Sequence, residues 1–484
     1  MTASARPSPS PSPAPSDSAA SATAPPRSLA PDIARGLMLA LIAIANVSWF
    51  LWGHEGTVGM TPHVPALGEL DTVVQFVMTV AVDHRAMPLF AFLFGYGMVQ
   101  FYRSRIDRGL EPRSVRIMLR RRHWAMLLLG LLHAALLFYG DILGAYAVAG
   151  LLLVWILFGR RTRTLIVWAS VIAGVLTLFA MFSLIGMLSL TFFAPPEAVA
   201  SASATTPYAN DWVRDLAYSG TYLWSILNRM VLWVPSSIAA GLMGAPLPIL
   251  LGWIAARHRL LEEPWRHVRA LRRIAIGGIA TGWAAGLPDA LVIAGTIRLP
   301  EGLDWGFYGL NVIGGAACGV GYAAAFALLA LRLERRLAPV PSAAVTDRES
   351  RRALRAERAA AHRALSPAER AYGDAASIDA PVPSAAPPAP VRVLAAVGQR
   401  SLTFYLFQSL LLAPLMAAWG LGLAPHLSTW SAVAIAFGVW LLSLPIAAWM
   451  DARGIRGPAE RLLRRMTYGK HDPRGRPDRA GPVV

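Results

Sequence analysis

The chain has 484 residues, of which 55% are hydrophobic and 15% charged, and its mean hydropathy is +0.47. This composition excludes a soluble multidomain protein and indicates a membrane protein. The net charge of +17 comes from basic residues that lie between apolar segments, so it indicates contact with membrane lipids and no nucleic-acid partner. A single cysteine, Cys318, excludes an intramolecular disulfide and a thiolate cluster, and no metal is expected.

The first 28 residues form a Ser/Pro/Ala-rich tract that cannot bury a core, and we expect it to be a disordered cytoplasmic tail. No cleavable signal peptide is apparent. The apolar run that follows is long enough to span a membrane, so we expect it to remain as the first anchor.

A membrane-spanning helix needs about 20 mostly apolar residues. By this measure the sequence predicts an all-α, polytopic helix bundle with about ten transmembrane helices. They are expected at 33–52, 86–102, 123–139, 142–158, 165–192, 232–256, 274–296, 308–331, 401–420 and 429–450.

The distribution of basic residues gives an orientation to these ten helices. If the N-terminus is cytoplasmic, 41 of the 45 Lys and Arg residues fall in cytoplasmic segments, and only Arg85, Arg214, Arg229 and Arg298 lie outside. Basic residues concentrate on the cytoplasmic side of membrane proteins. We therefore expect both termini in the cytoplasm.

The chain divides into five parts. Helices one to eight lie within 29–332, and helices nine and ten within 393–469. Between them, 333–392 is Arg/Ala/Pro-rich and predicted to be a flexible loop, with one Arg-rich helix near 350–365. Residues 470–484 form a basic tail. Outside the membrane, 194–230 is the largest segment, and its aromatic end at 211–224 suits an amphipathic lid.

The first candidate group opens the first helix. Asp32 and Arg35 are three residues apart, share a helix face and can form an ion pair. The pair has two interpretations. It is a helix cap with a cytoplasmic anchor, or Arg35 meets the phosphates of a cytosolic cofactor at the mouth of the bundle.

The second group is the stretch DHRAMPLFAFLFGYG, residues 83 to 97. Asp83, His84 and Arg85 are expected at the outer interface, near the level of Asp141. Gly95 and Gly97 would let a neighbouring helix or a ligand approach the backbone closely.

The third group is GLLHAALLFYGDIL, residues 130 to 143. His133 lies about 9 Å below the outer end of its helix, and Asp141 follows after a short turn. One interpretation makes His133 a general base supported by Asp141 or Asp83. The other makes Asp141 the N-cap of the next helix and His133 an interhelical hydrogen bond.

Two later stretches complete the set. Pro288-Asp289 is expected to end or break the seventh helix near its outer side. In the ninth helix, Ser401, Tyr405 and Gln408 share one face that must contact protein, and Gln408 with Arg35 is expected to line a cytoplasmic route.

Five blocks of sequence together resemble the YeiB-like bacterial membrane proteins, a family of domains of unknown function. They are DxxRG at Asp32 to Gly36 with Asn46, FAFLFGYG, GLLHAALLFYGDIL, VGQRSLTFYLFQSLL and GPAERLLRRMTYG. The family usually has Leu before the first Asp, where this chain has Pro31. The resemblance implies a multi-pass protein of the bacterial inner membrane.

Such proteins are similar to multi-helix membrane acyltransferases, and this implies acyl transfer from cytosolic acyl-CoA to an envelope acceptor. In that scheme His133, Asp141 and Asp83 are catalytic, and Arg35, Asp32 and Gln408 bind the donor. Two alternatives stay open: a small-molecule transporter that uses His133 and Asp141 as a proton relay, and a scaffold that acts through its Arg-rich loop.

Overall fold

The computed structural model describes residues 29–57, 61–205, 211–300, 302–337 and 388–468. These residues contain helices and no strand, in agreement with the predicted all-α bundle. The predicted tails 1–28 and 470–484, and the predicted helix near 350–365, lie outside the described residues. The ends of the predicted loop at 333–337 and 389–392 are helical.

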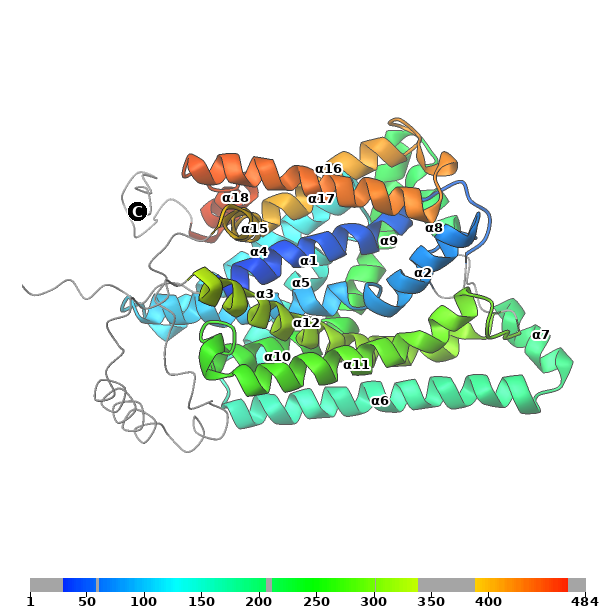
Figure 1. Cartoon of the computed structure of the whole chain (residues 1–484), viewed down its shortest axis with the longest axis horizontal. Helices are drawn as coiled ribbons and strands as arrows, with labels where there is room; N and C mark the ends of the chain where they lie inside the picture. Colours follow the sequence, from blue (N-terminus) through cyan, green and yellow to red (C-terminus); the bar gives the residue numbers. More distant parts are fainter. Residues whose placement is uncertain (1–28, 58–60, 206–210, 301, 338–387, 469–484) are drawn as a thin grey trace, which may run out of the picture.

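The helices run largely side by side along one direction (Figure 1). In chain order they are α1 (Ala30–Val47), η1 (Ser48–Phe50), α2 (Glu69–Ala81), α3 (Ala86–Ile106), α4 (Pro112–Leu136), α5 (Ile142–Ile156), α6 (Thr162–Phe193), α7 (Pro196–Thr205), α8 (Asp211–Tyr218), α9 (Tyr222–Ala239), η2 (Ala240–Gly244), α10 (Pro246–Arg257), η3 (Pro264–Arg266), α11 (Val268–Ile293), η4 (Asp304–Phe307), α12 (Tyr308–Leu337), α15 (Ala389–Gln399), α16 (Ser401–Met416), η7 (Ala424–His426), α17 (Thr429–Ala452) and α18 (Pro458–Tyr468).

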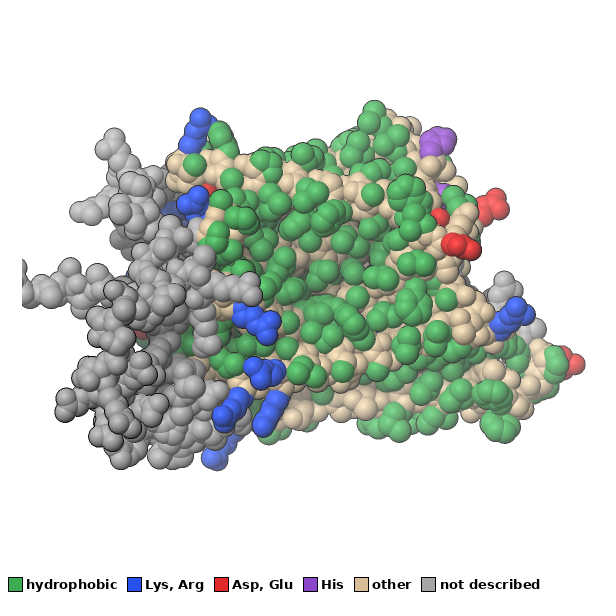
Figure 2. All heavy atoms as spheres, viewed as in Figure 1, with side chains coloured by type: hydrophobic (Ala, Val, Ile, Leu, Met, Phe, Trp, Pro, Cys, Tyr) green, Lys and Arg blue, Asp and Glu red, His purple; other side chains and the backbone are tan. Residues whose placement is uncertain are grey.

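The bundle has the surface of a membrane protein. Figure 2 shows hydrophobic side chains over the middle of the visible face, with Lys and Arg gathered toward one end and most acidic side chains toward the other. We call these the Arg-rich end and the opposite end. Seven described segments are long and apolar enough to cross a membrane: Ala30–Phe50, Glu69–Ile106, Thr162–Phe193, Tyr222–Gly244, Val268–Ile293, Asp304–Glu334 and Thr429–Ala452.

The remaining predicted spans are shorter or more polar. Three apolar helices of 10–17 residues, α5, α10 and α16, lie among the long ones. The predicted span 123–139 is the apolar half of α4, whose first half carries the Arg residues of 113–122. The helix type is confirmed, and the number of crossings remains a prediction.

The breaks in the helices differ from those expected. Pro288 does not interrupt α11, which continues to Ile293, so the predicted break there is wrong. The predicted span 232–256 is divided instead by the π-helix η2 and by Pro246. A second break lies at 82–85, where His84 takes a left-handed conformation (φ 57°) between α2 and α3. A count of apolar residues along the chain does not locate such breaks.

The segment predicted as an amphipathic lid, 211–224, lies at the opposite end and is held there by hydrogen bonds. Arg214 of α8 is fully buried and donates to the Pro62 carbonyl at 2.8 Å. Arg229 of α9 donates to the carbonyl of Ala135 at 2.9 Å, near the end of α4. One buried guanidinium group therefore holds this segment to the loop at Pro62, and another holds the following helix, α9, to the helix that carries His133.

Candidate functional site

His133 and Asp141 form a buried pair between α4 and α5. The Nδ1 atom of His133 lies 2.8 Å from Oδ1 of Asp141, and both side chains are at most 1% exposed. The other carboxylate oxygen of Asp141 accepts from the backbone N–H of Gly144 at 2.7 Å and caps α5. The cap and the histidine contact, which the sequence presented as alternatives, are both present.

Two glycines allow this pair to form. A Cβ atom on Gly130 of α4 would lie 2.5 Å from the Asp141 carboxylate and 2.6 Å from the Gly144 nitrogen. On α5, a Cβ atom on Gly144 would lie 2.4 Å from the ring of Trp233. Gly130 therefore lets α4 contact the start of α5 directly, and Gly144 leaves room for the Trp233 ring of α9 against α5.

The state of the His133 ring follows from its neighbours. An ionised carboxylate only accepts hydrogen bonds, so the neutral imidazole carries its proton on Nδ1 and a lone pair on Nε2. The Nε2 atom is buried and has no hydrogen-bond partner among the described residues. Tyr405 of α16 packs against the ring with centroids 5.1 Å apart, and its hydroxyl lies 3.5 Å from Oδ1 of Asp141. Asp141 thus orients the ring through Nδ1, and no described residue bonds to the lone pair on Nε2.

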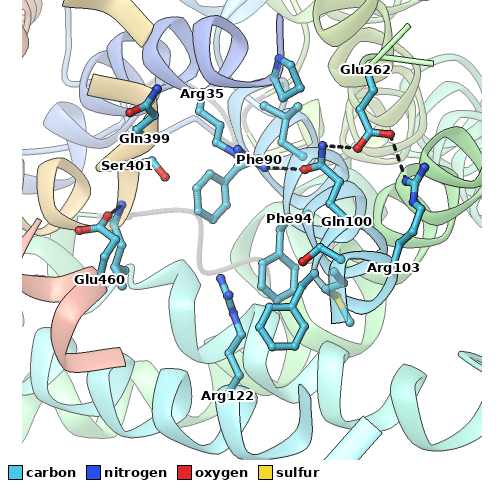
Figure 3. A pocket seen from close by; sticks show the side chains of 18 of the residues that line it. Arg35, Phe90, Phe94, Gln100, Arg103, Arg122, Glu262, Gln399, Ser401 and Glu460 are labelled. Atoms are coloured by element: carbon cyan, nitrogen blue, oxygen red, sulfur yellow. Dashed lines mark hydrogen bonds and ion pairs between the residues drawn. The ribbon is translucent and has the colours of Figure 1, made fainter. Parts of the chain in front are cut away.

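A cavity of about 760 Å³ is lined by several residues of the Arg-rich end, and Figure 3 shows side chains of its wall. Its mouth is polar and includes Arg103, Arg108 and Arg259. Farther in, the walls are apolar and formed by Met38, Phe90, Leu93, Phe94, Met126 and Leu143. This size and this division between polar and apolar walls are typical of ligand pockets.

Two arginines reach into the cavity from opposite sides. Figure 3 shows Arg35 of α1 and Arg122 of α4 pointing toward its interior. Arg35 also contacts Asp32 at 3.2 Å, which confirms the predicted ion pair. Arg122 has no ion-pair partner within the described part of the chain, and its guanidinium lies 5.7 Å from the ring of Phe101. A phosphate between them would meet two guanidinium groups.

Other charges at the mouth are neutralised within the protein. Arg103 pairs with Glu262 at 3.1 Å and Arg259 pairs with Glu263 at 2.9 Å. The hydrogen bond from Arg259 to Glu263 raises the pKa of that guanidinium. Glu460 of α18 accepts from the backbone N–H groups of Leu402 and Thr403 and so caps α16 at the cavity wall. Arg122 differs from Arg103 and Arg259 because no acidic side chain of the described residues forms an ion pair with it.

Asp83 lies elsewhere and has another partner. It is 5% exposed inside the bundle, whereas the sequence suggested the outer interface. Its Oδ2 lies 2.8 Å from Nε2 of His63, and Nδ1 of that ring lies 3.3 Å from the Ser48 hydroxyl. Next to it, Arg85 donates to the side chain of Asn311 at 2.8 Å. Asp83 thus supports His63 and not His133.

Of the three residues predicted to bind the donor, only Arg35 lines the cavity. Arg35 lines the cavity, and Asp32 lies behind it as its ion-pair partner. Gln408 is buried, donates to the Leu39 carbonyl at 2.9 Å and is not among the residues that line the cavity. Of the polar face predicted on the ninth helix, Ser401 lines the cavity and Tyr405 contacts Asp141.

Several site residues were missed from the sequence. Arg122 is one of eight basic residues in 103–122, and nothing local distinguishes it from those that face water. Phe90 is one aromatic residue among several in FAFLFGYG. His63 lies in a loop without a motif. The one available signal was that Arg122 and His133 are eleven residues apart, which places them on the same side of one helix.

The chain is similar to proteins of unknown function. The family described as protein of unknown function (DUF418) matches residues 255–345 and 364–470. The uncharacterized protein YxaH of Bacillus subtilis (strain 168) is 28% identical over 269 residues, which are 52% of this chain. The match spans 64% of that relative, less than two thirds of its length. No solved structure matches the chain. The resemblance expected from the five sequence blocks is confirmed.

Proposed function

We propose that this protein, which is similar to the YeiB-like, DUF418 family, is a membrane acyltransferase that binds an acyl thioester of the coenzyme A class in the Arg-rich cavity. The observation that carries the proposal is the His133 ring. Its Nδ1 is held by Asp141, its Nε2 has a lone pair and no described partner, and it lies behind the apolar end of the cavity. A positioned imidazole of this kind is a general base.

The reaction would proceed by direct transfer. Nε2 of His133 takes the proton from a hydroxyl or amine of an envelope acceptor, and the acceptor oxygen or nitrogen attacks the thioester carbonyl carbon. The new bond forms as the carbon–sulfur bond breaks. The leaving thiolate then takes the proton from the imidazolium, which restores the neutral ring. Asp141 stabilises the imidazolium while it exists.

The cavity would bind both ends of the donor, its phosphate groups and its acyl group. Phosphate groups suit Arg35 and Arg122, because guanidinium groups form strong bidentate hydrogen bonds with phosphate. The acyl group suits the apolar walls near Phe90 and Leu143, where it leaves water. With the orientation expected from the basic residues, the donor would enter from the cytoplasm and the acceptor from the envelope side.

The first test is transfer of a labelled acyl group in proteoliposomes. We expect the wild type to acylate at least one member of a panel of envelope saccharides and lipids. His133→Ala should lower the rate by about 10²–10⁴-fold, the usual contribution of general base catalysis. Leu132→Ala is the matched control, because this neighbouring side chain is 47% exposed on the lipid face of α4 and should leave the rate unchanged. Full activity in His133→Ala would refute the proposal.

A specific observation supports a second candidate, proton-coupled transport. The buried Asp83–His63 pair lies beside the break between α2 and α3, and broken helices with buried charges form the ion sites of many transporters. Transport would give proton-coupled flux without any acyl donor. That flux should be lost in Asp83→Asn and retained in His133→Ala, the reverse of the pattern expected for acyl transfer.

A further inference from the structure

Phe90 separates the cavity from His133. Its side chain lines the cavity, and its ring stacks on Tyr405 with centroids 6.3 Å apart. The Tyr405 ring in turn lies 5.1 Å from the ring of His133. Tyr405 is fully buried and is not part of the cavity wall. Two aromatic rings therefore stand between a ligand in the cavity and the histidine.

The helix faces that line the cavity continue toward His133. On α4, Leu119, Arg122 and Met126 line it, and His133 is seven residues beyond Met126 on the same face. At 1.5 Å per residue the histidine lies about 10 Å deeper. On α16, Ser401 lines the cavity and Tyr405 is one turn farther along. The cavity and His133 thus share one axis.

The shape of the cavity suits an elongated ligand that points along this axis. Its wall on α3 extends from Phe90 to Ser104, which corresponds to about 21 Å of helix. Arginines occupy the mouth, and the walls around Phe90 are apolar. A ligand with a phosphate head and an apolar tail would therefore bind with its tail against the Phe90 ring.

We infer that Phe90 is the specificity-determining residue of this site: its ring turns aside to admit the donor's acyl group from the Arg-rich end, and its volume restricts the site to short acyl groups. The statement about acyl groups rests on the proposed function. The access route through Phe90 holds whichever group is transferred, and it can be tested without any transfer assay.

Access is measured with cysteines in the full-length protein. In a Cys318→Ala background, Ser104→Cys places a thiol in the partly exposed part of the cavity wall and His133→Cys places one behind Phe90. Membrane vesicles of both orientations are treated with an anionic methanethiosulfonate reagent. We expect fast labelling of Ser104→Cys and slow labelling of His133→Cys, both from the Arg-rich end. Adding Phe90→Ala should raise the rate at His133→Cys at least tenfold.

The control is Phe92→Ala, which removes a buried ring on the same helix that does not line the cavity, and it should leave the labelling rate unchanged. Equal rates with and without Phe90→Ala, or labelling of His133→Cys only from the opposite end, would overturn the access route.

Chain-length preference is the second measurement, made with His133 intact. Phe90→Ala should shift transfer from short acyl-CoA donors toward longer ones, and Phe92→Ala should not. If Phe90→Ala opens access but no variant transfers an acyl group, the proposed function fails and the route stands. If the wild type transfers acyl groups and Phe90→Ala changes neither labelling nor chain length, the inference about Phe90 fails.

Discussion

At the scale of the single residue, the carboxylate of Asp141 makes two separate hydrogen-bond contacts. One oxygen caps the N-terminus of α5 through Gly144, and the other holds Nδ1 of His133. A carboxylate can do both because its two oxygens accept independently. The local pattern Gly140-Asp141-Ile142 predicts the cap, and the nearby histidine suggests the pair. What neither pattern could supply is Tyr405, which is 264 residues away in the chain and completes the site.

We expect Asp141→Asn to retain the helix cap and to lose acyl transfer. If the amide oxygen caps Gly144, the amide nitrogen faces His133 and donates to Nδ1, which moves the ring proton to Nε2. The ring is then the wrong tautomer for a base, and we expect the rate to fall by about 10²–10⁴-fold. Transfer from labelled acyl-CoA gives the rate, and thermal melting in detergent gives the stability.

The comparison variant for this prediction is Asp141→Ala, which loses the cap as well. It should cost about 0.5–2 kcal/mol of stability, whereas Asp141→Asn should melt close to the wild type. An Asp141→Asn protein with the wild-type transfer rate would show that Asp141 is a structural cap only.

At the scale of the helix, glycine pairs determine which elements meet closely. Gly130 brings α4 against α5, Gly144 leaves room for Trp233 of α9, and Gly95 and Gly252 bring α3 against α10. Small residues at crossings let helix backbones approach in membranes, where van der Waals contact replaces the hydrophobic driving force. The sequence predicted a close approach at Gly95 without identifying the partner. It could not do so, since glycine spacing is the same whichever helix packs there.

We expect Gly130→Ala to destabilise the protein and to disturb the His133–Asp141 pair. The new Cβ atom would lie 2.5 Å from the Asp141 carboxylate, closer than carbon and oxygen can approach. Overpacking of this kind costs about 1–3 kcal/mol. Thermal melting of the purified protein measures the effect, and transfer activity should fall with it.

A matched glycine provides the control for this experiment. Gly174 lies in α6 with no atom within 4 Å of the added Cβ, so Gly174→Ala should be neutral or slightly stabilising. If both alanine variants melt at the same temperature, the close crossing of α4 and α5 does not contribute to stability.

At the scale of the whole molecule, the charges divide the bundle into two unlike ends. Basic side chains gather toward one end and most acidic side chains toward the other (Figure 2). Arginines also line the cavity, and α8 at the opposite end is held by the buried Arg214. From the positive-inside rule we expect the Arg-rich end to face the cytoplasm. This orientation matters for function, because it decides which compartment supplies the ligand of the cavity.

We expect thiol labelling of intact cells to confirm this orientation. Ser219→Cys, after α8 at the opposite end, should react with an impermeant maleimide added outside. Ser114→Cys, near the start of α4, should react only after the cells are permeabilised. Both side chains belong to exposed residues, and the native Cys318 is buried, so the background should be low. The reverse pattern would place the cavity on the outside and exclude a cytosolic donor.

The sequence by itself determined what depends on local composition and spacing. Apolar run lengths predicted an all-α membrane bundle, the three-residue spacing of Asp32 and Arg35 predicted their ion pair, and a turn motif predicted the cap at Asp141. The tertiary structure decided what depends on which helices become neighbours. It paired Asp83 with His63, bound Gln408 to the Leu39 carbonyl outside the cavity lining, and joined residues of α1, α3, α4 and α16 around one axis that leads to His133. The physical reason is that an apolar helix face suits lipid or any other helix equally well. Only close packing between particular backbones selects its partner.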